Sequence, residues 1–252
     1  MNLVGTRIVA GVVALFWLVP FFGLIDLLVV VENDPDWHDS YLLEAGWGAL
    51  FTFLVAGPQV ALAARRSVAP GVVVAELLAV AVAITGAALW SGSLPLLVAA
   101  VLVAANALLL GAMSEVRRAF PPLDRALRIL VVVGAALGGA FAASVLADHP
   151  MADPDITNGL DHLPMQAALG LAMATVGAVA AAAVGGRVPG WRVPVWTLAL
   201  AVGWVGGWSI VYPDLAGSMG SGLGTAAVAW AAVFAITAEW RARRTTRHGV
   251  VA

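Results

Sequence analysis

The stretch PGVVVAELLAVAVAITGAALWSGSLPLLVAAVLVAANALLLGA, residues 70–112, contains two long apolar runs that a short turn, WSGSLP, separates. About 20 consecutive apolar residues let an α-helix cross the hydrocarbon core of a bilayer. Glycine and proline inside the turn interrupt the helical pattern. The stretch therefore predicts two transmembrane helices, 70–90 and 94–114, joined by a tight turn at Pro95.

The whole chain shares this apolar character. Of its 252 residues, 62% are hydrophobic and 11% are charged, and its mean hydropathy is +0.95. A soluble domain is about half apolar and about a quarter charged. The composition therefore predicts an all-α integral membrane protein, whose first partner is the lipid bilayer.

Cysteine and lysine are both absent, and all 13 basic residues are arginine. Without cysteine the chain forms no disulfide, thiolate-held metal site or iron–sulfur cluster. Without a lysine amine it cannot hold retinal as a Schiff base. The net charge of −2 predicts no nucleic-acid partner.

Eight apolar runs are long enough to span a membrane. The predicted spans are 8–31, 42–64, 70–90, 94–114, 127–147, 163–185, 193–212 and 218–239. The first run is longer than the apolar core of a signal peptide and no small-residue cleavage site follows it, so we expect a retained span.

The arginines test this count of spans. They occur before span one, after spans two, four, six and eight, and nowhere else; the clusters are Arg7, Arg65–Arg66, Arg117–Arg128, Arg187–Arg192 and Arg241–Arg247. With eight spans every arginine falls on one side. The positive-inside rule makes that side cytoplasmic, which predicts a multi-pass protein of the cytoplasmic (inner) membrane with both termini inside. Topology alone accounts for these clusters, and binding of anionic headgroups is the alternative.

Two decapeptides at corresponding places suggest an internal repeat. DSYLLEAGWG, residues 39–48, aligns without a gap on DHLPMQAALG, residues 161–170, with Asp, Ala and Gly in common and Glu44 opposite Gln166. Other matches follow in the same order, including Arg65 with Arg187. We expect two four-helix units, 1–120 and 121–252, related as a parallel repeat by a pseudo-two-fold axis along the membrane normal.

Small residues at four-residue spacing predict where helices pack closely. Span five contains Gly134 and Gly138, and span seven contains Gly203 and Gly207. Without a hydrophobic drive between helices in lipid, such residues allow backbones to approach. We expect close helix contacts at both pairs.

The polar residues at the outer ends of spans are the first candidate site. They are His38, Asp39, Glu44, His149, Asp161, His162 and Gln166. Imidazole and carboxylate groups suit a divalent cation such as Zn²⁺, Cu²⁺ or Ca²⁺, which would be the cofactor of this site. The simpler reading is that Asp39 and Asp161 are helix N-caps, and neither reading excludes the other.

A second set of polar residues lies within the predicted spans. It contains Asp26, Gln59, Glu76 and Asn106. Ionisable groups inside a membrane are costly unless they are paired, hydrated or neutral, so they mark functional positions. Proximity to the membrane interfaces is the alternative for Asp26 and Glu76.

Three function classes follow from these features. The first is a protein that binds a cation or a small polar ligand at an outer vestibule. The second is a small-solute transporter or channel that uses Asp26 and Glu76, and the third is a structural or assembly subunit with a homo-oligomeric or membrane-complex partner. An enzyme with a large active domain is not expected, because the longest predicted loop, 148–162, is too short to form a soluble domain.

Overall fold

The computed structural model describes residues 3–32, 35–113, 124–149 and 162–248, and regular structure within these ranges is helical. The elements are α1 (Leu3–Leu18), α2 (Gly23–Glu32), η1 (Pro35–Ser40), α3 (Tyr41–Ala49), η2 (Leu50–Ala56), α4 (Gly57–Ala64), α5 (Pro70–Ser91), α6 (Leu94–Ala112), α7 (Arg125–Asp148), α8 (His162–Gly185), α9 (Arg192–Val211) and α10 (Gly220–His248). Seven helical segments within these ranges are long and apolar enough to cross a membrane, or eight if the bent pair α1–α2 is one span. The prediction of a multi-pass helical membrane protein is confirmed.

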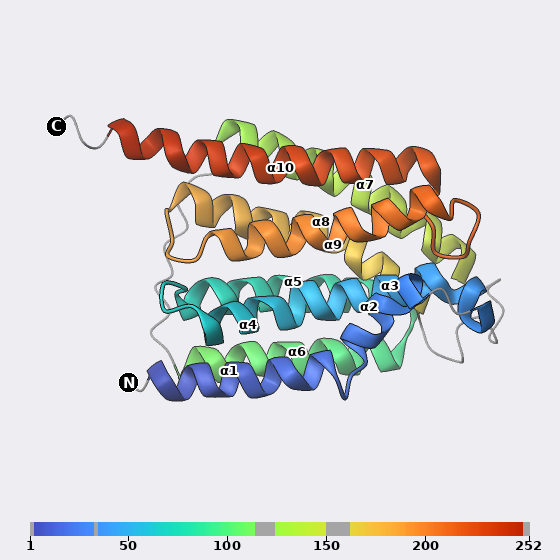
Figure 1. The fold of residues 1–252 in the computed structure, drawn as a ribbon, viewed down its shortest axis with the longest axis horizontal. Helices are drawn as coiled ribbons and strands as arrows, with labels where there is room; N and C mark the ends of the chain where they lie inside the picture. Colours follow the sequence, from blue (N-terminus) through green and yellow to red (C-terminus); the bar gives the residue numbers. More distant parts are fainter. Residues whose placement is uncertain (1–2, 33–34, 114–123, 150–161, 249–252) are drawn as a thin grey trace.

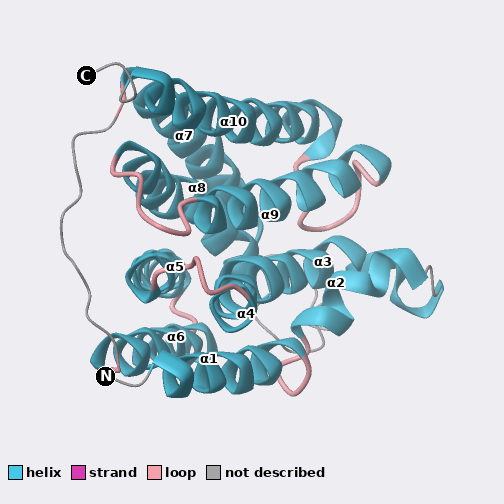
Figure 2. Cartoon of the chain, turned by 60° about the vertical axis from the view of Figure 1, so that its left-hand side comes forward, coloured by secondary structure: helices cyan, strands magenta, loops and turns pink. Residues whose placement is uncertain are grey.

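The long helices are stacked in pairs across the bundle (Figure 1). In order, the layers are α1 with α6, α3–α4 with α5, α9 with α8, and α10 with α7, and the turned view in Figure 2 shows the same stacking. Helix α5 packs against both α6 and α8, while α9 packs against α10, α8 and α3. The middle layers are therefore the protein core, and the outer helices offer exposed apolar side chains such as Ile8, Leu108 and Ile236 to lipid.

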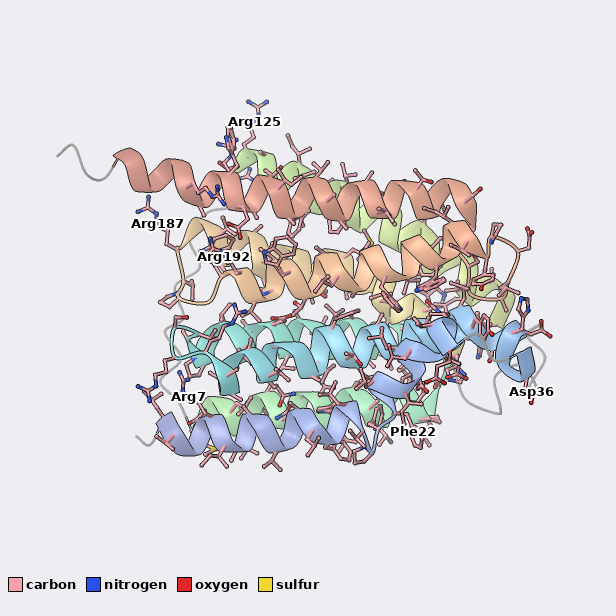
Figure 3. All side chains as sticks on the ribbon, viewed as in Figure 1. Arg7, Phe22, Asp36, Arg125, Arg187 and Arg192 are labelled. Carbon is pink, nitrogen blue, oxygen red and sulfur yellow. The ribbon has the colours of Figure 1, made fainter. Side chains whose placement is uncertain are left out.

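The two ends of the bundle differ in charge. Helix α1 begins and α10 ends at the same end, where Arg7, Arg187 and Arg192 also lie, whereas Asp36 lies at the opposite end (Figures 1 and 3). We call the first the arginine end, defined by Arg7, Arg65, Arg187, Arg192 and Arg241. The other is the acidic end, defined by Asp36, Asp39 and Glu44.

The first predicted span, 8–31, is bent, because residues 19–22 interrupt its helix. Pro20 has no amide hydrogen and its ring collides with the preceding helical turn, and Phe22 takes a left-handed conformation with φ of 62°. Helices α1 and α2 therefore meet at 44°. Trp47 donates its indole N–H to the carbonyl of Phe21 at 3.2 Å, which satisfies a backbone group that the break exposes.

The second span is continuous in direction but not in helix type. Its middle, Leu50–Ala56, is a π-helix that ends just before Pro58. Proline has no N–H to donate to the carbonyl one turn earlier, and its ring crowds that carbonyl. The helix is therefore wider, as a π-helix, before the α-helix resumes. The π-helix lies in the middle of the bundle, against both α1 and α9.

The expected glycine contacts are confirmed in α7 but not in α9. A Cβ atom on Gly138 would lie 2.1 Å from the carbonyl oxygen of Gly170 in α8. In α9, Gly207 meets nothing within 4 Å, and Gly206 is the residue that approaches a neighbour, with Gly224 of α10. The prediction is therefore wrong for Gly207, whereas a Cβ atom on Gly203 would lie 4.0 Å from Ala231 of α10.

At the arginine end, helix α8 stops in a left-handed turn. Val188 donates its amide to Ala183 at 3.0 Å and Arg187 donates to Val184 at 3.1 Å, the pattern of a Schellman motif. Glycine is usual at the left-handed position, but Arg187 occupies it with φ of 48°. A side chain there costs roughly 1–2 kcal/mol.

Ion pairs at the same end join α10 to its neighbours. The guanidinium of Arg192 meets the carboxylate of Glu239 with two bonds, of 2.6 and 2.8 Å. Arg241 lies 3.2 Å from Asp124, which also caps α7. These pairs attach the last helix at the level where the bundle meets water.

Candidate functional site

The structure divides the residues expected at the acidic end into two groups. Glu44, His162 and Gln166 are buried and lie together, and we call them the Glu44 cluster. His38 and Asp39 are exposed on η1 and contact each other at 3.4 Å. His149 is half-buried at the end of α7, and Asp161 lies outside the described residues. Of the residues expected at the vestibule, the structure thus brings Glu44, His162 and Gln166 together.

The expectation that Asp39 caps a helix is wrong. Ser40 precedes α3 and makes no capping bond with its side chain, and the side chain of Asp39 is 83% exposed. A 3₁₀-helix, Pro35–Ser40, leads directly into α3, so the Asp39 side chain has no free first-turn amide to reach.

The Glu44 cluster is formed by α3 and by the first turn of α8. His162 Nε2 lies 3.3 Å from Glu44 Oε2, and the exposed fractions of the two residues are 1% and 8%. One turn along α8, Gln166 donates its amide N–H to the carbonyl oxygen of Leu42. The side chains of His162 and Gln166 thus connect the start of α8 to α3.

Two glycines make room for Gln166. A Cβ atom on Gly46 would overlap the Gln166 amide, and one on Gly217 would lie 3.3 Å from its nitrogen. Gly217 has φ of 76°, a conformation that glycine adopts without strain. Sequence reasoning missed both glycines and Trp47, whose ring centroid lies 5.2 Å from that of His162. Gly46 and Trp47 stood beside Glu44, but no pattern marked them.

Several polar atoms of the cluster form no hydrogen bond with the described residues. They are Oε1 of Gln166 and both ring nitrogens of His162, although Nε2 lies 3.3 Å from Glu44. An unpaired polar atom in a buried site costs about 1–3 kcal/mol. Together with Glu44 they supply one imidazole, one carboxylate and one amide oxygen, which are cation ligands. Within the described ranges, no group of three or more His, Asp or Glu gathers that could hold a metal, so any cation here also needs Gln166 or water.

An aromatic group lies beside the cluster at the acidic end. His38 contacts Tyr41 and Tyr212, with ring centroids 5.3 and 5.8 Å apart, and Tyr212 stacks on Trp208. The exposed histidine is thus positioned by rings rather than by the Glu44 cluster.

The four polar residues expected within the spans do not form one site. Asp26 is half-buried on α2, and Asn106 is buried on α6 with no partner for either amide atom. Gln59 donates to the carbonyl of Val55 at 2.9 Å. Glu76 is fully buried on α5 and is hydrogen-bonded to the hydroxyl of Thr197 on α9.

The contact between Glu76 and Thr197 constrains the proton on the pair. Thr197 Oγ1 also lies 2.9 Å from the carbonyl of Val193, but a hydroxyl has one hydrogen. If that hydrogen goes to Val193, the carboxyl group of Glu76 must be neutral and donate to Thr197. Sequence reasoning missed Thr197, because a threonine in an apolar helix gives no distinguishing signal.

Comparisons with known proteins add no relative. No family model, curated protein or solved structure matches this chain.

Proposed function

We propose that this protein is a polytopic protein of the cytoplasmic membrane that binds a small cation at the Glu44 cluster. The observation that carries the proposal is the buried set of Glu44, His162 and Gln166, in which His162 Nε2 lies 3.3 Å from Glu44 Oε2, while His162 Nδ1 and Gln166 Oε1 form no hydrogen bond with the described residues. Buried polar groups are normally satisfied, so these atoms fit a site that a ligand completes.

The electrostatics of the acidic end favour a cation over an anion. Glu44 contributes a buried carboxylate, and Asp26 lies on α2, which packs against α3. Arg7, Arg187 and Arg192 lie at the opposite end (Figure 3). An imidazole nitrogen with oxygen ligands suits Zn²⁺ or another first-row divalent ion, with Ca²⁺ as the oxygen-only alternative.

The architecture that we propose around the site is eight spans in two four-helix units, 1–120 and 121–252. If α1–α2 is one span, the chain has eight spans, and an even number returns it to the side where it began. The start of α1 and the end of α10 do lie at the same end of the bundle (Figure 1). Under the repeat, α5 corresponds to α9, and α8 to the span α3–η2–α4. The packing of α5 against α8 then has its counterpart in the packing of α9 against α3, which supports a pseudo-two-fold axis near the Glu44 cluster.

The orientation that we propose places the arginine end in the cytoplasm. The described arginines gather at one end of the bundle, which is the pattern that the positive-inside rule requires. The Glu44 cluster then lies toward the extracytoplasmic side, which is the side from which a cation would reach it without crossing the bilayer.

Metal titration of the purified protein tests the proposal. Apparent unfolding temperature is measured in neutral detergent against Zn²⁺, Mn²⁺, Cu²⁺ and Ca²⁺. A ligand that binds only the folded state stabilises it by about 2.7 kcal/mol at a concentration 100 times its dissociation constant. We expect a saturable rise with at least one of these ions.

Two variants connect the response to the cluster. Glu44→Gln keeps the shape of the side chain and removes its charge, so it should abolish the response without unfolding the protein. His38→Ala is the control, because His38 lies at the same end but is half exposed. A flat response of the wild type to all four ions, or an unchanged response in Glu44→Gln, contradicts a cation site here.

A second candidate is transport of a small solute, and the Glu76–Thr197 contact favours it. Glu76 is buried between two middle-layer helices, and Gly57 at the end of the π-helix lies against Thr197. Glu76→Gln should abolish uptake into proteoliposomes while leaving metal-dependent stabilisation intact. If neither Glu44→Gln nor Glu76→Gln changes any ligand response, a structural subunit of a membrane complex becomes the better explanation.

A further inference from the structure

Two corresponding loops meet at the arginine end. Loop 65–69 joins α4 to α5, and loop 186–191 joins α8 to α9. The amide of Ala69 donates to the carbonyl of Pro189 at 3.0 Å. Gly190 has φ of 90° and packs against Val68, so that a Cβ atom added to Gly190 would lie 3.0 Å from Cγ1 of Val68. The loops are thus held in a defined arrangement.

A hollow of about 360 Å³ lies between these loops. Residues of both loops line it, among them Arg65, Ser67, Arg187, Trp191 and Arg192. Three of these side chains are guanidinium groups, and a serine hydroxyl adds another donor. We call it the arginine hollow.

Two of the three guanidinium groups are available to a ligand. Arg192 is engaged with Glu239 and lies over the ring of Trp191 at 4.7 Å. Arg65 and Arg187 are exposed, and no carboxylate of the described residues pairs with either of them. The hollow therefore carries a positive charge that the described protein does not neutralise.

The backbone adds to this positive field and indicates that Arg187 is functionally useful. Helix α9 begins at Arg192 in the wall of the hollow, and the N-terminus of a helix carries partial positive charge. Arg187 occupies a left-handed position that glycine would take without strain. Strained residues of this kind concentrate at ligand-binding sites.

We propose that the arginine hollow binds a phosphate group through Arg65 and Arg187. Guanidinium groups match the geometry of phosphate oxygens and bind them with paired hydrogen bonds. The hollow lies at the end of the spans, beside Trp191, whose amphipathic ring suits the headgroup level of a bilayer. The phosphate can therefore come from an anionic phospholipid or from a soluble phosphate, and the proposal is independent of the cation site at the opposite end.

Stability titrations of the detergent-purified full chain test the proposal and distinguish the two sources. The three probes are phosphatidylglycerol, inorganic phosphate and, as the neutral comparison, phosphatidylcholine. We expect a saturable rise in unfolding temperature with a phosphate-bearing anion and none with phosphatidylcholine. A rise with phosphatidylglycerol alone assigns the site to lipid, and an equal rise with inorganic phosphate assigns it to a soluble anion.

Three variants distinguish a loss of ligand affinity from a loss of stability. Arg187→Gly relieves the left-handed strain, so without ligand it should be at least as stable as the wild type, yet its apparent affinity should fall about tenfold or more. Arg65→Gln should lose a similar factor. Arg66→Gln is the matched control, because Arg66 is adjacent and exposed but does not line the hollow.

Three results would overturn the proposal. The first is equal stabilisation by phosphatidylcholine and phosphatidylglycerol together with no effect of inorganic phosphate. The second is an affinity that Arg65→Gln and Arg187→Gly leave unchanged. The third is an equal loss in Arg66→Gln, which would mean that general surface charge, and not the hollow, attracts the anion.

Discussion

Replacement of Gly138 by alanine is the most direct test of how the second half of the bundle packs. Gly138 and Gly170 face each other on α7 and α8, and each would place a Cβ atom against the carbonyl of the other. The change adds one methyl group to a helix that is otherwise unaltered, so its effect reports on this contact.

The structure allows the magnitude to be worked out. The new Cβ atom would lie 2.1 Å from the carbonyl oxygen of Gly170, whereas ordinary contact begins near 3.4 Å. The helices must therefore separate by about 1.3 Å, because a backbone oxygen has no rotamer to change. Overpacking of this kind typically costs about 1–3 kcal/mol, and the gain in helix propensity from glycine to alanine returns about 1 kcal/mol or less. We expect a net loss of about 1–2 kcal/mol of unfolding free energy.

The adjacent residue supplies the control. A Cβ atom on Gly139 meets nothing within 4 Å, so Gly139→Ala should be neutral or slightly stabilising. Unfolding of both variants is followed by circular dichroism as sodium dodecyl sulfate is titrated into mixed micelles. If the two variants unfold at the same detergent fraction, the close approach of α7 and α8 is incorrect.

Two further predictions use the same assay. Gly206→Ala should destabilise the protein, because the new atom would lie 3.0 Å from both Ala227 and the Gly224 carbonyl, while Gly207→Ala should be tolerated; equal effects would contradict the assigned α9–α10 contact. Glu76→Gln should change the unfolding free energy by less than about 1 kcal/mol, since it mimics a neutral carboxyl group beside a hydroxyl. A large loss in that variant would mean that the carboxylate form is required.

The polar candidate residues show which part of the site can be predicted from the sequence. Glu44, His162 and Gln166 stood out because polar side chains are rare beside long apolar runs, and the structure brings these three together. His38 and Asp39 had the same residue types and lie apart from them, on an exposed 3₁₀-helix. Residue type therefore indicated which groups were costly to bury, but only the direction of each element decided which of them were buried.

The spans, the split of charge between the two ends and the turn at Pro95 were all determined by the sequence alone. Each depends on the local composition of the chain. About twenty consecutive apolar residues can cross a membrane whatever other helices pack against them. Helix contacts are different, because lipid and protein interiors are equally apolar and hydrophobicity does not mark the packed face. Only the tertiary structure therefore showed that Gly206, and not Gly207, faces α10, and that Glu76 meets Thr197. Such choices depend on steric fit between elements far apart in the sequence.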